Sequence, residues 1–288
     1  MADTAARERA PEINRAALPG RRSNFGVAFV FLPRAQRDAI RAVHAWSRAV
    51  DDAVDEAETD ADAREALGAW QREVARLYEG EPATAVTRAL RPHVAGFAIP
   101  RSYFEELVSG VEMDLTRTRY ETFPELATYC HRVASVVGLI CLRIFGDAEE
   151  RGRAYAENLG LALQLTNILR DVGADLARGR VYLPEDERLR FGYDEDSLAR
   201  GERSEAFLAL MRFQAARARA FFAAAEREAA TLDRRRFLAA EIMGRVYRRL
   251  LDRIESSGFD VFRRETRVPK LERIWIAAST ALAIRTAG

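Results

Sequence analysis

The amino-acid sequence predicts an all-α protein, and three observations support this prediction. Apolar residues recur with helical spacing, for example at Ile40, Val43, Trp46 and Val50. The strict alternation typical of a half-buried strand is nearly absent from the chain. Prolines and glycines lie between the periodic segments, where helices are expected to begin or end. Together these features indicate a large helical bundle.

The proline and glycine breaks define the expected helices in chain order. A helix is expected to start at Pro33, and later breaks separate about ten helices in all. The breaks are Pro33, Gly80 to Pro82, Pro92, Gly96 to Pro100, Pro124, Gly146, Gly179 to Pro184, Gly192, Gly201, Gly258 and Pro269. No self-similarity with a period of about 20 to 50 residues occurs, so a solenoid is excluded.

The expected helix from Ala154 to Asp171 is apolar almost all round, with leucine at positions 159, 161, 163, 165 and 169. A helix of this kind is expected to be buried on every side, as in the central layer of a bundle. Polar residues within it are costly unless they have partners, so each of them requires a reason.

Composition and charge narrow the class of protein. The 288 residues carry 45 basic and 44 acidic side chains, a net charge of +1, so no global basic field favours nucleic acid as a partner. No linker divides the chain, which predicts one domain over residues 21–288 after a flexible lead-in over residues 1–20. Cys130 and Cys141 form neither a disulfide framework nor a metal-ligand pattern, which fits a reducing cytoplasm.

The longest apolar runs lie near Val133 to Ile140 and near Trp275 to Ile284. Both are shorter than the roughly 20 residues that a membrane-spanning helix needs. We therefore expect a cytoplasmic protein, with peripheral contact at the inner face of the membrane as the only membrane association.

The first candidate site is the segment RAVDDAVDE, in which Arg48, Asp51 and Asp55 share one helix face. Two carboxylates four residues apart repel each other, so their presence after an apolar run suggests a cation between them. The alternative is a solvated acidic helix end, because Glu56 and Glu58 continue the acidity.

The second candidate site is a stripe formed by Asn167, Asp171 and Asp175, at steps of four residues. Asn167 and Gln164 interrupt one of the most apolar segments of the chain, and a buried amide without partners costs about 1 to 3 kcal/mol. A solvated face is therefore a weak explanation for this stripe, and a binding function is favoured.

The two stripes offer oxygen ligands and no nearby histidine or cysteine, which is typical of sites for a hard cation such as Mg²⁺. Such sites hold the ion with a few carboxylates and with phosphate oxygens of the substrate. Arg48, Arg170 and Arg180, together with Tyr182, lie beside the stripes and offer donors for those oxygens. The predicted ligand is a diphosphate.

These motifs resemble those of the squalene/phytoene synthase family. The resemblance runs from about Ser23 to Ile276 and includes SNFGVAFVFLP, the Asp51 and Asp55 pair, VEMDLTRTRY, YCHRVASVVGL, QLTNILRDVGADLARGRVYLP, VYRRLLDRI and VPKLERIWIA. Within the family, the segments VEMDLTRTRY and YCHRVASVVGL look most like those of bacterial presqualene diphosphate synthases of hopanoid biosynthesis.

The resemblance implies a single-domain isoprenoid synthase bundle with a central apolar cavity, and it assigns roles to individual residues. Asp51, Asp55, Asn167, Asp171 and Asp175 would hold Mg²⁺, with Mn²⁺ as an alternative, and the four aspartates and Tyr129 would be catalytic. The diphosphate and reaction-centre contacts would be Ser23, Asn24, Arg48, Gln164, Arg170, Arg180, Tyr182, Tyr247 and Arg264. An apolar wall would exclude water from a carbocation; its candidates are Ala134, Val137, Gly138, Leu139 and Leu163.

Three departures from the family pattern bear on these assignments. Many relatives have a pair of serines where this chain has Ser23 and Asn24, and Glu265 follows Arg264 where a second arginine is common. His44 stands where a tyrosine is usual, and we interpret it as an ordinary helix histidine, with donation to a phosphate as the alternative. His93 and His131 are interpreted as structural.

The implied function is Mg²⁺-dependent head-to-head condensation of two farnesyl diphosphates to presqualene diphosphate. No Gly-rich dinucleotide fingerprint is visible, so NADPH is not expected to be required. The first alternative is a phytoene synthase that joins two geranylgeranyl diphosphates. A metal-dependent all-α phosphohydrolase and a catalytically silent helical binding protein are alternatives of other classes. Expected partners are prenyl diphosphates and downstream isoprenoid enzymes.

Overall fold

The computed structural model describes residues 28–146 and 149–286, and within those ranges it is helical, with no strand. The predicted lead-in over residues 1–20 lies outside the described residues. The helices are η1 (Ala28–Phe31), α1 (Arg34–Asp55), α2 (Asp60–Glu79), α3 (Ala85–Gly96), α4 (Arg101–Thr116), α5 (Phe123–Cys130), η2 (His131–Ser135), α6 (Val136–Phe145), α7 (Glu149–Ala177), α8 (Glu185–Arg190), α9 (Glu195–Ala199), α10 (Glu205–Ala229), α11 (Leu238–Ser256) and α12 (Lys270–Thr286).

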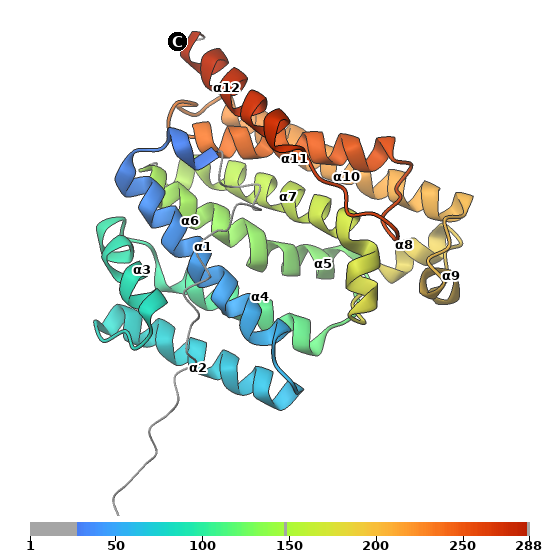
Figure 1. Cartoon of the computed structure of the whole chain (residues 1–288), viewed down its shortest axis with the longest axis horizontal. Coiled ribbons are helices and arrows are strands. Elements are labelled where there is room, and N and C mark those ends of the chain that lie inside the picture. Colours follow the sequence, from blue (N-terminus) through green and yellow to red (C-terminus); the bar gives the residue numbers. More distant parts are fainter. Residues whose placement is uncertain (1–27, 147–148, 287–288) are drawn as a thin grey trace, which may run out of the picture.

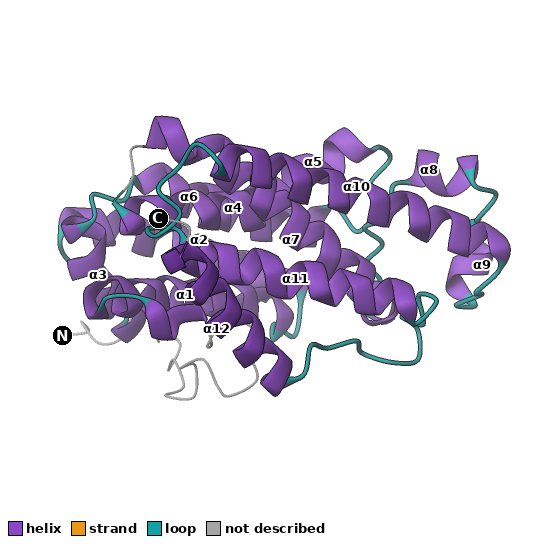
Figure 2. Ribbon diagram, turned by 90° about the horizontal axis from the view of Figure 1, so that it is seen from above, coloured by secondary structure: helices purple, strands orange, loops and turns teal. Residues whose placement is uncertain are grey.

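Helix α7 forms the centre of the bundle. It packs against α5, α6, α10 and α11, and Figure 1 shows it between the α1 side of the molecule and the α10 and α11 side. This position explains why the α7 segment is apolar almost all round, and it confirms the predicted central layer. Viewed from above in Figure 2, most long helices follow the long axis of the molecule, with α3 near one end and α8 and α9 near the other.

Helix α1 is held in place by an aromatic cluster. Trp46 is fully buried and lies edge-on to Trp70 of α2, at 6.3 Å between ring centroids, and to Phe104 of α4, at 4.8 Å. Edge-to-face pairs at these distances stabilise a core beyond their buried area. The cluster fixes the buried face of α1, and with it the direction of the opposite, acidic face.

Most of the predicted helix boundaries are confirmed. Helix α1 begins directly after Pro33, α2 ends at Gly80 in the left-handed region, and α12 begins after Pro269. The break between α1 and α2 has no proline or glycine and was not predicted. Its signal is Thr59, whose hydroxyl oxygen accepts a 3.2 Å hydrogen bond from the backbone N–H of Asp62 and so caps α2.

The predicted break at Pro92 is wrong, because Pro92 lies inside α3. Proline removes one helical hydrogen bond and crowds the preceding turn. Here the residue is exposed, so water can solvate the carbonyl that loses its partner. The helix therefore continues for another turn, to Gly96.

Helices α5, η2 and α6 join into one continuous helix from Phe123 to Phe145, which contains the apolar run near Val133 to Ile140. By length and composition this helix could cross a membrane, which the apolar run alone did not suggest. Half of its most apolar stretch is buried inside the protein, where it packs against α4 and α7. This packing is typical of a core helix.

Candidate functional site

The two predicted acidic stripes face each other across a cavity of about 210 Å³ between α1 and α7. Its lining is mainly polar, and four apolar side chains complete it. The lining residues are Arg48, Asp51, Val54, Asp55, Val111, Asp114, Tyr129, Val133, Gln164, Asn167, Ile168, Asp171, Asp175, Arg180 and Tyr182. The structure therefore brings together all five predicted metal-holding residues, which come from two helices far apart in the sequence.

On the α1 side, Arg48, Asp51 and Asp55 all line the cavity, as their shared helix face predicted. Burial, and then the nearby carboxylates of Asp114 and Asp55, raise the pKa of Asp51 to about 7, although Arg48 opposes this shift. The guanidinium of Arg48 itself donates a 3.1 Å hydrogen bond to Asp52. Ionisation of Asp51 is therefore unfavourable in this cavity, and a bound cation would offset that cost.

On the α7 side, Asn167 carries the clearest sign of an incomplete site. Its amide nitrogen donates a 3.4 Å hydrogen bond to Gln164, and among the described residues no donor reaches its buried Oδ1. Burial and the neighbouring Asp171 raise the pKa of Asp175 to about 7. An orphaned amide oxygen beside crowded carboxylates is the environment that a bound cation would relieve.

Two arginines that sequence reasoning assigned to the diphosphate already bind carboxylates. The guanidinium of Arg170 pairs with both oxygens of Asp171 and does not line the cavity. Arg180 lines the cavity and donates a 3.1 Å hydrogen bond to Asp55, while the more exposed Arg178 lies 3.5 Å from the other oxygen of the same carboxylate. Asp55 therefore links the end of α1 to the segment that follows α7.

Asp114 of α4 was missed as a site residue, although it lies in the quoted segment VEMDLTRTRY. Its carboxylate accepts hydrogen bonds from the hydroxyls of Tyr182, at 2.7 Å, and Tyr129, at 3.1 Å. Burial raises its pKa, and the two tyrosines and Arg180 oppose that shift. The available signal was a second acidic residue, two positions after Glu112, between the apolar residues Met113 and Leu115.

Tyr182 reaches Asp114 because two loops are paired. The backbone N–H of Val181 donates to the carbonyl of Thr118 at 2.8 Å, and that of Glu185 donates to the carbonyl of Tyr120 at 2.9 Å. The rings of Tyr129 and Tyr182 stack at 5.1 Å between centroids. Burial raises the pKa of both tyrosines, so their hydroxyls stay protonated and available as donors.

The π-helical segment η2 shapes the wall of the cavity at Val133. A Cβ atom added to Gly160 of α7 would lie 2.6 Å from Cα of Ser135, and one added to Gly110 of α4 would lie 2.8 Å from Cβ of Arg132. Glycine on both sides therefore lets η2 approach α4 and α7 closely. Single π turns inside helices often occur at functional sites, and this one was not predicted.

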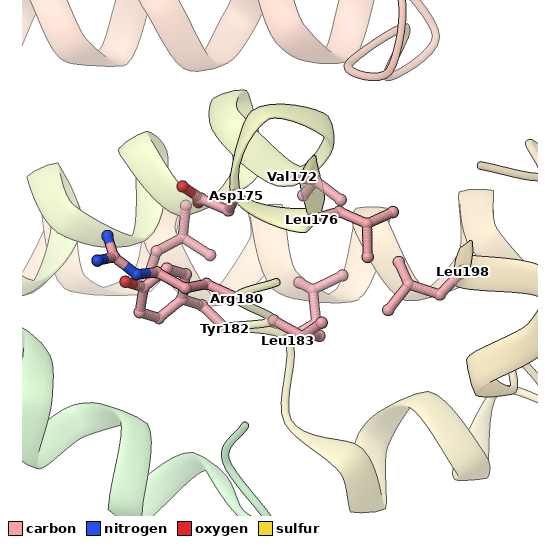
Figure 3. Close-up of a pocket in the computed structure, with 9 residues that line it drawn as sticks. Val172, Asp175, Leu176, Arg180, Tyr182, Leu183 and Leu198 are labelled. Carbon is pink, nitrogen blue, oxygen red and sulfur yellow. The ribbon is translucent and has the colours of Figure 1, made fainter. Parts of the chain in front are cut away.

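A second pocket, of about 10 Å³, lies behind the α7 carboxylates and has room for about one water molecule. Figure 3 shows Asp175 and Arg180 at one end of it and Leu198 at the other. The side chains in between are mostly apolar, among them Val172 and Leu176. The apolar side chains around this pocket pack against Asp175 and Arg180, and the pocket is too small to bind a substrate.

The remaining predicted contacts occupy varied positions. Ser23 and Asn24 lie outside the described residues. Arg264 is exposed and does not line the cavity. Tyr247 of α11 is buried, interacts electrostatically with Arg170 and does not line the cavity. Their roles in binding diphosphate stay predictions.

The five predicted wall residues do not line the 210 Å³ cavity, where Val133, Val111 and Ile168 supply apolar surface. Leu139 is buried in the core, and a Cβ on Gly138 would lie 3.0 Å from the carbonyl oxygen of Ala156, so Gly138 faces α7. Ala134, Val137 and Leu163 are partly buried. That these residues meet a prenyl chain stays a prediction.

The three histidines do not line the cavity. Burial, and then the charge of Arg48, lower the pKa of His44, which keeps its imidazole neutral at pH 7. His131 lies 3.6 Å from a carboxylate oxygen of Glu106.

The donor set of the cavity fits Mg²⁺ by its chemistry, because it combines five carboxylates with the orphaned Asn167 oxygen. Within residues 28–146 and 149–286, no group of three acidic, histidine or cysteine side chains is close enough to hold an ion alone. A ligand set that is split between two helices in this way needs oxygens from a bound molecule to complete it. The arginines at the rim suit an anionic one.

Comparisons with known proteins agree with this chemistry. The family described as squalene/phytoene synthase matches residues 18–272. The 15-cis-phytoene synthase of Synechococcus elongatus is 38% identical over 264 residues, which cover 87% of this chain and 85% of that protein. A dehydrosqualene synthase crystallised with a ligand is 26% identical, has a TM-score of 0.84 and covers 92% of this chain and 93% of its own.

The squalene synthase HpnC from Alicyclobacillus acidocaldarius is 29% identical, with a TM-score of 0.78, over 85% of this chain and 92% of its own. These likenesses confirm the isoprenoid synthase fold, and they show that the chain is a prenyltransferase of the squalene/phytoene synthase type, which joins two prenyl diphosphates head to head. The chain belongs to the squalene/phytoene synthase family.

Proposed function

We propose that the chain is a phytoene synthase that joins two geranylgeranyl diphosphates head to head. The observation that carries this proposal is the 38% identity to a phytoene synthase over 87% of the chain, against 29% and 26% for the two squalene-type structures. It favours the twenty-carbon alternative over the presqualene diphosphate interpretation of the sequence.

The first chemical step breaks the bond between C1 and the diphosphate oxygen of one substrate, and negative charge develops on the departing group. Asp51, Asp55, Asn167, Asp171 and Asp175 would hold Mg²⁺. The ion, when bound, supplies charge stabilisation for that leaving group. Arg48 and Arg180 line the same cavity and provide donors for the diphosphate oxygens.

The allylic cation left at C1 is then attacked by the double bond of the second substrate, and loss of a proton closes a cyclopropane ring. Loss of the second diphosphate, rearrangement and loss of a second proton complete the hydrocarbon. Two diphosphates and two protons leave in total, so no reductant is needed, in keeping with the expectation that NADPH is dispensable. The released diphosphates are the bases that accept the two protons, because Tyr129 and Tyr182 stay protonated and act as donors.

The volume of the cavity bears on substrate length. At about 210 Å³ it is smaller than ordinary ligand pockets, which measure about 300 to 1,000 Å³, so it takes the diphosphate end but not two prenyl chains. Entry of the chains therefore requires neighbouring side chains to move. Gly138 and Gly110 line the close helix contacts that limit such movement.

The second candidate is the condensation of two farnesyl diphosphates to presqualene diphosphate. It is favoured by the likeness to a dehydrosqualene synthase structure, with a TM-score of 0.84 over 92% of the chain. The two candidates share the first condensation and the diphosphate chemistry of the cavity. They differ in the length of the prenyl chains and in whether the cyclopropyl diphosphate is converted to a hydrocarbon.

A competition experiment separates the two candidates. The purified protein with Mg²⁺ receives equal amounts of farnesyl and geranylgeranyl diphosphate, and mass spectrometry follows both substrates and all lipid products. We expect geranylgeranyl diphosphate to be used at least tenfold more efficiently and to give phytoene without NADPH. Preferential use of farnesyl diphosphate would establish the second candidate. Asp171→Ala serves as the inactive control, and inorganic phosphate as the main product would instead indicate a phosphohydrolase.

A further inference from the structure

Helix α12 carries an exposed apolar face that the bundle does not use. Seven large apolar side chains are exposed among the described residues, and four of them lie on α12. They are Leu271 (80% exposed), Ile274 (44%), Trp275 (70%) and Leu282 (65%). The exposed Ala278 lies between them, and these five residues are named the α12 stripe.

The α12 stripe is continuous along the helix. At 100° per residue its five positions fall within an arc of about 100°, and at 1.5 Å per residue they extend over about 16 Å. The opposite face, which includes Ile276, Ala277 and Ile284, is buried where α12 packs on α11. Figure 1 shows α12 on the outside of α11. The helix is therefore apolar on both faces, unlike an ordinary surface helix.

The charges around the α12 stripe are unequal. Residues 263–286 contain six basic and two acidic side chains, in a chain whose overall net charge is only +1. The two acids are neutralised, because Glu265 pairs with Arg267 and Glu272 pairs with Arg249 and Arg253. Lys270 and Arg285 are exposed at the two ends of the helix. The surroundings of the stripe are thus positively charged.

We propose that the α12 stripe docks on a lipid bilayer that contains anionic lipids. The leucine and isoleucine side chains suit the apolar interior of such a bilayer, and a tryptophan suits its interface. The exposed basic residues at the ends of the helix suit its negatively charged surface. A second copy of the chain fits less well, since a stable protein interface uses about 20 to 30 residues on each side and the stripe has five. The inference concerns where the enzyme sits and does not depend on which prenyl diphosphate it uses.

Tryptophan fluorescence and vesicle sedimentation test this proposal on the full chain. Trp46 and Trp70 are buried, so Trp275 is the tryptophan that reports on the surface. With phosphatidylcholine vesicles that contain about 30% phosphatidylglycerol, we expect the protein to sediment with the vesicles and its emission to shift to shorter wavelength. Binding should be at least tenfold weaker with phosphatidylcholine alone, because each basic residue near an anionic surface contributes about 1 kcal/mol.

The test variant is Leu271→Ser/Trp275→Ser/Leu282→Ser, whose three side chains are exposed and leave the core intact. It should lose vesicle binding at least tenfold and keep the circular dichroism spectrum of the parent. The matched control is Leu189→Ser on α8, which removes an apolar side chain that is 61% exposed on another element and should bind like the parent.

Three results would overturn the proposal. The first is equal binding of the parent to charged and uncharged vesicles, and the second is vesicle binding that the triple variant retains. The third is a parent protein that light scattering shows to be a dimer, when the triple variant is a monomer and Leu189→Ser is still a dimer. The last result would assign the stripe to a second copy of the chain.

Discussion

The hydroxyl of Tyr182 donates a 2.7 Å hydrogen bond to the carboxylate of Asp114, although the two residues are 68 positions apart in the sequence. Tyr129 donates to the other oxygen of the same carboxylate at 3.1 Å. This buried group of three side chains ties α4, α5 and the loop after α7 together at the cavity. The two hydrogen bonds to Asp114 hold Tyr129 and Tyr182 in position relative to the acidic stripes.

Replacing Tyr182 by phenylalanine should lower kcat/KM about tenfold and the free energy of unfolding by about 1 kcal/mol, because the buried Asp114 loses a donor. Tyr78→Phe is the control: its hydroxyl donates a 2.7 Å hydrogen bond to the carbonyl of Ile99, away from the cavity. The control should lose similar stability and keep its activity. Steady-state kinetics and urea unfolding measure both effects, and equal activity in the two variants would contradict a role for Tyr182 in the site.

Arg180→Gln should raise KM for the prenyl diphosphate at least tenfold, because Arg180 lines the cavity and fixes Asp55. Arg178 contacts the same carboxylate but does not line the cavity, so Arg178→Gln should change KM less than threefold. Initial rates across a range of substrate concentration distinguish the two. If both variants raise KM alike, Arg180 acts only through its ion pair with Asp55.

Asp51→Asn should stabilise the metal-free protein at neutral pH. The carboxyl pKa is about 7 in the folded protein and about 3.9 in an unfolded chain, so the folded state holds more protons between pH 4 and 7. The free energy of unfolding of the parent therefore falls as pH rises through that window. Asparagine does not ionise, so the variant avoids this loss of stability. At pH 8 the loss is on the order of 1 kcal/mol, because solvent that reaches the cavity screens the charge of Asp51.

Urea unfolding at pH 4 and pH 8, in the presence of a chelator, measures the stability difference between Asp51→Asn and the parent. The difference should be near zero at pH 4 and appear at pH 8. Glu56→Gln, at an exposed position just beyond α1, is the control and should show no such dependence. A variant that is less stable than the parent at pH 8 would show that Asp51 already has a stabilising partner.

Mg²⁺ and inorganic diphosphate should together raise the melting temperature by about 5 °C or more at saturating concentrations, and by more than the sum of their separate effects. The reason is that the carboxylates of α1 and α7 need ligand oxygens to complete the coordination of the ion. Asp171→Asn should abolish the joint effect. Differential scanning fluorimetry provides the measurement, and an equal rise with Mg²⁺ alone would show that the protein forms a complete metal site unaided.

Gly160→Ala should lower the free energy of unfolding by about 2 kcal/mol or more, because its Cβ would lie 2.6 Å from Cα of Ser135 and push α7 away from η2. Gly96→Ala in α3 is the matched control, since no atom lies within 4 Å of the added Cβ. The control should be neutral or slightly stabilised. Chemical denaturation of both variants checks the pair, and a neutral Gly160→Ala would show that α7 and η2 can separate without cost.

Local spacing was sufficient to predict the acidic faces of α1 and α7. Residues four apart share a helix face whatever surrounds the helix, so Asp51 with Asp55, and Asn167 with Asp171 and Asp175, could be grouped without a structure. The same periodicity predicted that the segment Ala154 to Asp171 of α7 lies inside the bundle, and the structure describes no exposed residue in it. The chemistry of a diphosphate site followed from residue types alone.

Contacts between distant segments could not be predicted in this way. The pairing of Arg180 with Asp55 spans 125 positions, and the position of Tyr182 depends on hydrogen bonds between two loops. The break before α2 was missed because a threonine cap, and not proline or glycine, begins that helix. The π turn at His131–Ser135 has no local signal and depends on the space that Gly110 and Gly160 provide.

The sequence by itself thus determined most of the helix boundaries, the helix faces that carry oxygen ligands, and the hard cation and diphosphate that those ligands suit, because these properties depend on neighbours within two turns. The class of reaction came from the resemblance to a known family. Only the tertiary structure decided that α1 and α7 face each other, that Asp114 joins the site, and that Arg170 is held by Asp171 outside the cavity. Those outcomes depend on the packing of the whole bundle, where each helix direction is set by side chains far away in the chain.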